Sequence, residues 1–118
     1  MKKEAGPEDV SFQTMKQCLI IYMRQELDHH SVAALREQAD KRMDRENMKH
    51  IIFDFAGVNF MDSSGIGMIM GRYKKVNFTG GKVAVTSVNP SVDRIFRLSG
   101  IYKMIEKYNT VKEALEAL

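Results

Sequence analysis

Hydrophobic and polar positions alternate at the start of the chain. Val10, Phe12 and Thr14 are separated by polar residues, a pattern typical of a half-buried strand. Residues 18–23 are apolar throughout, and a run of this length predicts a buried second strand after a turn at residues 16–17. The fold is therefore expected to open with an antiparallel hairpin.

The next segment changes from the period of a strand to that of a helix. Asp28 and the polar residues after it can cap a helix N-terminus. A helix over about 30–46 is predicted because apolar residues recur every three or four positions, at Val32, Leu35, Ala39 and Met43. Residues 51–55 are apolar except for Asp54 and favour β-structure, which indicates a central strand.

The same alternation of strand and helix continues to the end of the chain. A second helix has apolar positions from Ile66 to Val76 and ends at Gly80-Gly81, since glycine adopts the left-handed conformation found at helix ends. A strand over 82–88 follows. Asn89-Pro90 begins a third helix that ends at Gly100. Residues 103–106 predict a short edge strand, and Thr110 with Glu113 forms a capping box for a final helix.

The predicted order is β-β-α-β-α-β-α-β-α. This order indicates an α/β fold with a mixed sheet, in which the opening hairpin is antiparallel and the β-α-β units are parallel with right-handed crossovers. Residues 1–9 are polar and contain Gly6 and Pro7, so they predict a flexible leader before a single domain over 10–118.

Composition narrows the classes of function. The chain has 118 residues, which suits one domain, and its single cysteine, Cys18, excludes an intramolecular disulfide. The net charge is +3, but basic and acidic residues are interleaved, so no nucleic-acid surface is expected. We expect a cytoplasmic protein without a membrane partner, because no apolar run has the length of a signal peptide or membrane span.

Residues 59–67, NFMDSSGIG, follow the central strand and begin the second helix. Ligands and modifications often lie where a strand leads into a helix, because the first helical N–H groups are unpaired and carry the positive end of the helix dipole. Three interpretations are open. The segment is an ordinary capped helix with Asp62 or Ser63 as N-cap, a nucleotide or phosphate site built on its glycines, or a regulated serine.

Other chemistry has weak support in the sequence. Gly65, Gly67 and Gly71 depart from the dinucleotide fingerprint, and the next strand lacks the expected acidic residue. His29 and His30 are adjacent and have no matching ligand pair, and Asp54 lacks the neighbouring acidic pair of a phosphoacceptor site. We therefore expect no catalytic residue, metal or cofactor.

Residues 60–67 and the following GRYK at 71–74 resemble the anti-sigma factor antagonists of the STAS domain family. Residues 26–30 resemble the first strand-to-helix corner of that family, residues 89–92 and 98–101 match its later landmarks, and the likeness runs from about 10 to 118. It is strongest for the members that control sporulation. Gln25 departs from the family pattern, which commonly has glycine there.

The resemblance implies a binding protein and no enzyme activity. Its unphosphorylated form would bind an anti-sigma factor that is also a serine kinase, and so release sporulation sigma factor F. Phosphorylation at Ser64 would end binding, and a serine phosphatase would restore it. Control of a general-stress sigma factor and, from another class, small nucleotide or phosphate binding remain as alternatives. The free chain is expected to be a monomer or weak dimer.

The predicted site lies at one edge of the sheet. Ser64 is the predicted phosphoacceptor, and Asp62 and Ser63 are expected to orient it or to cap the helix. Asp28 is predicted to contact the partner, with a helix N-cap as the equally weighted alternative. The full set of predicted partner-binding residues is Asp28, Asp62, Ser63, Ser64, Gly65, Ser91 and Arg94.

Overall fold

The computed structural model describes residues 9–118 and has the predicted α/β architecture. Its strands are β1 (Val10–Met15), β2 (Cys18–Met23), β3 (His50–Asp54), β4 (Val83–Thr86) and β5 (Glu106–Tyr108). Its helices are α1 (His29–Glu46), α2 (Ser63–Phe78), α3 (Pro90–Ser99), the short 3-10 helix η1 (Ile101–Lys103) and α4 (Val111–Ala117). The predicted leader lies, apart from Asp9, outside the described residues.

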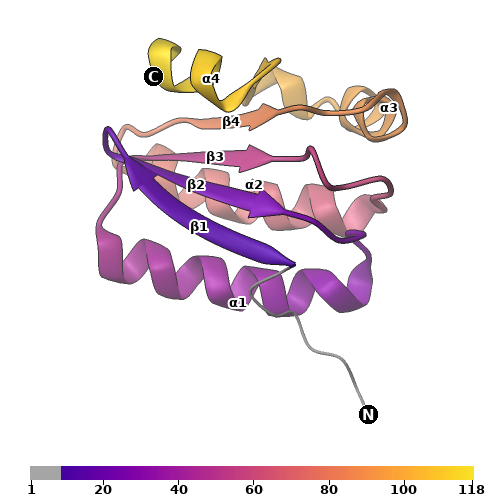
Figure 1. The fold of residues 1–118 in the computed structure, drawn as a ribbon, viewed down its shortest axis with the longest axis horizontal. Coiled ribbons are helices and arrows are strands. Elements are labelled where there is room, and N and C mark those ends of the chain that lie inside the picture. The colour runs from indigo at the N-terminus through magenta and orange to yellow at the C-terminus, as the bar shows by residue number, and fades with distance from the viewer. Residues whose placement is uncertain (1–8) are drawn as a thin grey trace.

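The strands form one sheet in the order β1-β2-β3-β4-β5. β1 pairs antiparallel with β2, and the remaining neighbours are parallel, as predicted. Figure 1 shows α1 and α2 running along the sheet on one side and α4 on the other. The carboxyl ends of β2 and β3 therefore point to the end of the molecule where α1 and α2 begin. In the described part of the chain, no helix is long and apolar enough to cross a membrane.

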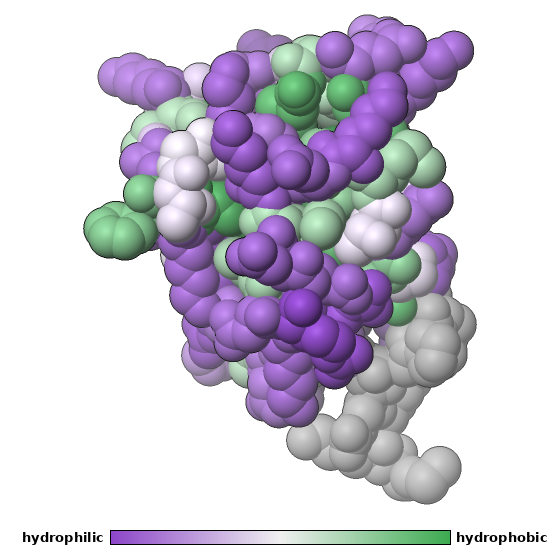
Figure 2. All heavy atoms as spheres, turned by 90° about the vertical axis from the view of Figure 1, so that its left-hand side faces the viewer, coloured by the Kyte–Doolittle hydropathy of each residue, from purple (hydrophilic) through white to green (hydrophobic). Residues whose placement is uncertain are grey.

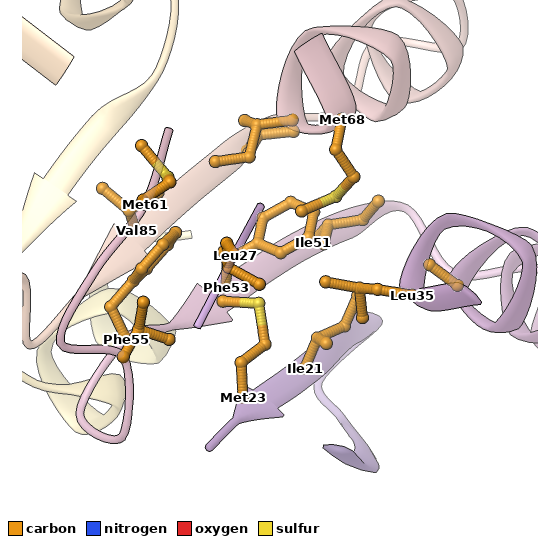
Figure 3. Packing of buried hydrophobic residues seen from close by; sticks show 14 of the residues in the cluster. Ile21, Met23, Leu27, Leu35, Ile51, Phe53, Phe55, Met61, Met68 and Val85 are labelled. Carbon is orange, nitrogen blue, oxygen red and sulfur yellow. The ribbon is translucent and has the colours of Figure 1, made fainter. Parts of the chain in front are cut away.

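Alternate residues of β2 supply two cores. Leu19, Ile21 and Met23 pack on the side of α1 and α2, whereas Cys18 and Ile20 pack with Ala114 of α4. Figure 3 shows the first core, in which β2 and β3 side chains meet Leu35 of α1 and Met68 of α2. This division explains the apolar run over 18–23, since a strand covered on both faces buries nearly all its side chains, and only Tyr22 is half-buried here.

The hairpin turn has the geometry of a two-residue loop. Lys16 and Gln17 both have positive φ, 52° and 65°. Such a turn matches the twist of the flanking strands, although glycine and asparagine adopt it more readily than lysine and glutamine. The turn predicted at this position is confirmed.

An ion pair fixes α1 against α2. Arg72 Nε lies 3.0 Å from Asp40 Oδ1, and Lys75 Nζ lies 3.0 Å from the same oxygen. Arg72 is buried and also donates to the carbonyl of Met68 at 3.3 Å. A buried guanidinium is tolerated when it is paired and hydrogen-bonded in this way. The pair therefore helps to set the distance between the two helices that frame the site.

The strand predicted over 103–106 is wrong in position. Gly100 has φ 77°, and the chain then forms η1, in which the Ile105 N–H donates to the carbonyl of Ile101 at 3.1 Å. Ile101 and Ile105 are both buried by this turn. Pairing with β4 starts only at Glu106, because the turn must first bring these two side chains into the core.

The capping box predicted at α4 forms in a modified way. Thr110 Oγ1 accepts a hydrogen bond from the Glu113 N–H at 3.1 Å, as predicted. The Glu113 carboxylate accepts from the N–H of Asn109 at 3.1 Å, one residue before the N-cap. In a standard capping box this second bond comes from the N–H of the N-cap residue, so here the box spans one residue more.

Candidate functional site

Two strand-to-helix corners are joined by main-chain hydrogen bonds. Leu27 and Met61 form an isolated parallel bridge. The Leu27 N–H donates to the carbonyl of Phe60 at 2.9 Å, and the Asp62 N–H donates to the carbonyl of Leu27 at 2.9 Å. The next residue after each bridge partner, Asp28 or Asp62, is the N-cap of α1 or α2. The bridge therefore holds the two capping carboxylates on neighbouring corners.

Asp28 caps α1 with a complete capping box. Its Oδ1 accepts from the N–H groups of His30 at 3.0 Å and Ser31 at 2.8 Å. The Ser31 hydroxyl oxygen accepts from the Asp28 N–H at 3.1 Å, and the hydroxyl donates to the carbonyl of Glu26 at 2.7 Å. The N-cap role of Asp28 is confirmed, and its contact with a partner stays a prediction.

Asp62 caps α2 and also holds the predicted phosphoacceptor. Its Oδ1 accepts from the Ser64 N–H at 2.8 Å, and the Ser64 hydroxyl donates to the same oxygen. The Gly65 N–H donates to the Asp62 carbonyl at 3.0 Å. A carboxylate thus already occupies the helix N-terminus, which weighs against a nucleotide or phosphate ligand on the same amides.

Both capping carboxyls are stronger acids than usual. The pKa of Asp62 is lowered chiefly by the hydroxyl of Ser64 and then by its N–H, while the nearby charge of Asp28 opposes the change. The pKa of Asp28 is lowered chiefly by the N–H of Ser31. Hydrogen bonds to the ionised form have this effect. Both corners are therefore negatively charged at neutral pH.

Exposure differs among the three residues of the motif. Ser63 is exposed, Ser64 is half-buried and Gly65 is buried. A Cβ at Gly65 would lie 2.5 Å from both Cγ and Sδ of Met61, so only glycine fits between α2 and the bridge. The two hydroxyls are thus within reach of another protein, whereas Gly65 serves the packing beneath them.

A cavity of about 880 Å³ lies between the starts of α1 and α2, at the right-hand end of the molecule in Figure 1. Its lining includes Asp28, His29, Arg36, Ser64 and Met68. The structure therefore brings the predicted phosphoacceptor and Asp28 to one hollow. Arg36 was not predicted for the site, because its mixed-charge neighbourhood in the sequence is typical of a solvated helix face.

The third predicted group lies on the same edge but in another hollow. Ser91 and Arg94 are exposed near the start of α3, and Arg94 lines a smaller cavity of about 350 Å³. The side-chain amide of Asn89 donates to the carbonyl of Val58 at 3.0 Å and so ties this helix to the loop before α2. A surface that includes Ser64 and Arg94 must therefore span both hollows.

Phe60 is an exposed aromatic residue beside the serine motif, and the sequence analysis did not single it out. Its side chain is 47% exposed, directly before the bridge residue Met61. Large exposed aromatic side chains are frequent in protein interfaces. Its place next to the serine motif is the one sequence signal, since an aromatic residue by itself normally predicts core.

Two polar residues outside the site have structural roles. His50 Nδ1 accepts from the Lys82 N–H at 3.0 Å, a partner that the sequence did not reveal. Asp54 is buried and accepts from the Thr86 hydroxyl at 2.8 Å. Figure 2 faces the end of the molecule opposite the cavity, where hydrophilic side chains lie above and below a band of hydrophobic ones.

Comparison with known proteins agrees with this geometry. The STAS domain profile matches residues 9–114, and the chain belongs to the STAS domain family. The anti-sigma F factor antagonist of Paenibacillus polymyxa is 42% identical over 100 residues, which cover 85% of this chain and 86% of that protein. The anti-sigma-B factor antagonist of Staphylococcus aureus (strain NCTC 8325 / PS 47) is 28% identical over 76 residues, 64% of this chain and 69% of that protein.

Solved structures of an anti-sigma factor antagonist are also similar. Unphosphorylated SpoIIAA matches with a TM-score of 0.80 and 27% identity, covering 92% of this chain and 94% of that chain. The phosphorylated form of Bacillus SpoIIAA matches with a TM-score of 0.71 and 26% identity, covering 92% and 97%. The resemblance seen in the sequence is confirmed.

Proposed function

We propose that this chain is an anti-sigma factor antagonist that is switched off by phosphorylation at Ser64. The unphosphorylated form binds an anti-sigma factor with serine kinase activity in the cytoplasm, and sigma factor F is released. A serine phosphatase regenerates the binding form. The observation that carries the proposal is the Ser64 hydroxyl, which lies at the start of α2 and lines an open cavity with Asp28.

The choice of sigma factor F follows the similarity of the relatives. The anti-sigma F factor antagonist is 42% identical over 85% of this chain, whereas the anti-sigma-B factor antagonist is 28% identical over 64%. Sporulation is therefore favoured over general stress as the response that the chain serves.

Phosphorylation changes the charge of the site without requiring a new fold. A phosphate adds about −1.5 to −2 charge at neutral pH. It replaces the proton that Ser64 donates to Asp62, so this hydrogen bond is lost and a dianion faces a carboxylate. The helix N-terminus favours a negative charge by about 0.3–1 kcal/mol, which offsets part of the repulsion. Both forms of SpoIIAA match 92% of this chain, which supports a scaffold that is kept.

The effect of the phosphate is expected at the interface. A partner that covers Ser64 must remove water from the new dianion, and an unpaired buried charge is far more costly than a buried hydroxyl. A loss of about 2.7 kcal/mol already weakens binding about a hundredfold. Complete burial of the phosphate is therefore not needed for release.

Incubation with the cognate anti-sigma kinase and ATP tests the proposal, with the modified residue located by mass spectrometry. We expect one phosphate, on Ser64, and none on Ser64→Ala. Ser63→Ala is the matched control, because Ser63 is the exposed neighbour and its loss leaves the Asp62–Ser64 contacts in place. Modification at Ser63, or of Ser64→Ala, contradicts the proposed switch.

A further inference from the structure

The two edges of the sheet are protected to different degrees. β5 has three residues, and Glu106 and Lys107 give it charge of both signs. β1 has six residues with the sequence VSFQTM, which contains neither a charge nor a proline. Its register with β2 is continuous from Val10 opposite Met23 to Met15 opposite Cys18, without a bulge. Short or charged edges resist pairing, whereas long uncharged edges accept another strand.

The outer side of β1 carries backbone groups that do not pair with β2. Met15 and Cys18 flank a two-residue turn and form a hydrogen-bonded pair, and such pairs alternate along an antiparallel ladder. The N–H and C=O groups of Val10, Phe12 and Thr14 therefore point away from β2. Within residues 9–118, β1 has β2 as its only strand neighbour.

We propose that β1 pairs antiparallel with β1 of a second copy of this chain. With Phe12 opposite Phe12 of the second copy, Val10 of each copy faces Thr14 of the other. The outward-facing groups of Phe12 then pair at the axis. Those of the exposed Thr14 meet Val10, which is 4% exposed in the single chain, so this end of β1 must be uncovered before the two sheets become one continuous sheet. This pairing is self-complementary, as a twofold interface requires.

The side of α1 next to this edge also suits a second copy. Arg42 lies over the ring of Phe12, 5.0 Å from its centroid. Arg42 also forms an ion pair with Glu46 at 3.7 Å, so the charge beside the edge is neutralised within one chain. A twofold axis perpendicular to the sheet places the two α1 helices on one face, and no unpaired like charges from these residues oppose each other there.

The proposed pairing leaves both phosphoacceptors accessible. β1 begins at the end of the sheet where α2 starts with Ser64, because it runs antiparallel to β2. Antiparallel pairing of two β1 strands therefore directs the two Ser64 ends away from each other. Ser64 itself takes no part in the strand pairing, although Asp9 next to Val10 lines the same cavity.

Sedimentation velocity of the full chain over micromolar to millimolar concentrations tests the proposal. We expect a reversible dimer in the wild type. Thr14→Pro removes one outward N–H per copy without removing a bond to β2, and should raise the dimer Kd about tenfold or more. Thr14→Val keeps the N–H and should dimerise like the wild type. A wild-type chain that stays monomeric at millimolar concentration, or equal dimerisation of Thr14→Pro, overturns the proposal.

A second substitution tests the same edge without altering the backbone. Gln13→Lys places two like charges diagonally across the twofold axis and should also weaken the dimer. Asn77→Lys adds the same charge at an exposed position of α2 and should leave it unchanged. Circular dichroism of each variant checks the fold. If Gln13→Lys and Asn77→Lys change the dimer Kd equally, the β1 edge is excluded as the interface.

Discussion

At the scale of single residues, one oxygen atom connects helix capping to the proposed switch. Asp62 Oδ1 accepts both the N–H and the hydroxyl of Ser64. The same carboxylate therefore begins α2 and orients the phosphoacceptor. Phosphorylation of the hydroxyl therefore changes a contact of the residue that caps α2. Variants of Ser64 can separate this effect on the helix from the effect on partner binding.

Ser64→Ala should bind the anti-sigma factor about as well as the wild type, because a methyl group needs no desolvation. Ser64→Glu should bind poorly, since it places a carboxylate beside Asp62 and under the partner. Isothermal titration calorimetry measures both affinities. Equal binding by the wild type and Ser64→Glu contradicts a charge-based switch.

Asp28→Asn should separate capping from partner binding. Asparagine is as good an N-cap as aspartate, so the melting temperature should stay the same. Affinity for the anti-sigma factor should fall if the charge of Asp28 contacts the partner. Asp28→Ala, which loses the cap, serves as the destabilised control. Unchanged affinity of Asp28→Asn leaves Asp28 with the capping role alone.

Gly65→Ala should lower the free energy of unfolding by about 1–3 kcal/mol, because the new Cβ overlaps buried Met61. Gly67→Ala is a matched control two residues further along α2, where a Cβ meets no atom within 4 Å. There alanine should stabilise the helix by up to about 1 kcal/mol. Urea denaturation measures both, and a Gly65→Ala variant as stable as the wild type contradicts the close packing.

At the scale of elements, Asp93 joins three segments. It is buried on α3 and accepts from Arg97 Nε at 2.7 Å, from the Tyr102 hydroxyl of η1 at 2.6 Å and from Lys107 Nζ of β5 at 2.9 Å. Burial by itself would raise the pKa of Asp93, but these donors outweigh it and lower the pKa to about 2. The Asp93 carboxylate therefore fixes η1 and β5, the region where the structure differs from the strand predicted over 103–106.

The Asp93 contribution to stability should depend on pH in a defined window. Its pKa is lower in the folded chain than the value of about 3.9 in an unfolded chain. The contribution is therefore complete above about pH 4 and is lost as the pH falls toward 2. Asp93→Asn should be less stable than the wild type by about 1–2 kcal/mol at pH 7, and this difference should shrink by pH 2. Denaturant titrations at both pH values measure it, and a constant difference contradicts the assignment.

Local signals explain which elements were predicted and which were displaced. Helices α2 and α3 have their caps within the motif that starts them, Asp62 and Asn89, so their starts could be read from the sequence. The position of β5 depends on Ile101 and Ile105 reaching a core formed by distant segments, which no local pattern records. The turn at 16–17 was found from the flanking strands, although its own residues are unusual for it.

At the scale of the whole molecule, the sequence predicts the edge of the site but not its shape. Parallel strands end on one side of a sheet, so Asp28 and Ser64 were expected on the same edge. Their common cavity depends on the bridge between Leu27 and Met61, which are far apart in the chain. The sequence also did not reveal that Arg94 lines a different, smaller cavity, because its lining brings α3 together with Lys107 of β5.

Phosphorylation of Ser64 should leave the fold in place and loosen one turn. The amide of Ser64 loses its capping partner when the phosphate repels Asp62, so its hydrogen exchange should become faster. Amides in β2 and β3 should exchange as before. Exchange measured by mass spectrometry on both forms tests this, and faster exchange throughout the sheet contradicts it.

The two hydrogen bonds of the bridge between the corners join main-chain atoms. Side chains that line the cavity, such as Arg36, take no part in these two bonds, so their replacement should leave the spacing of the two acidic caps unchanged. Substitution of the side chains that line the cavity can therefore change which partner binds. The bridge that positions the serine can stay the same for each partner.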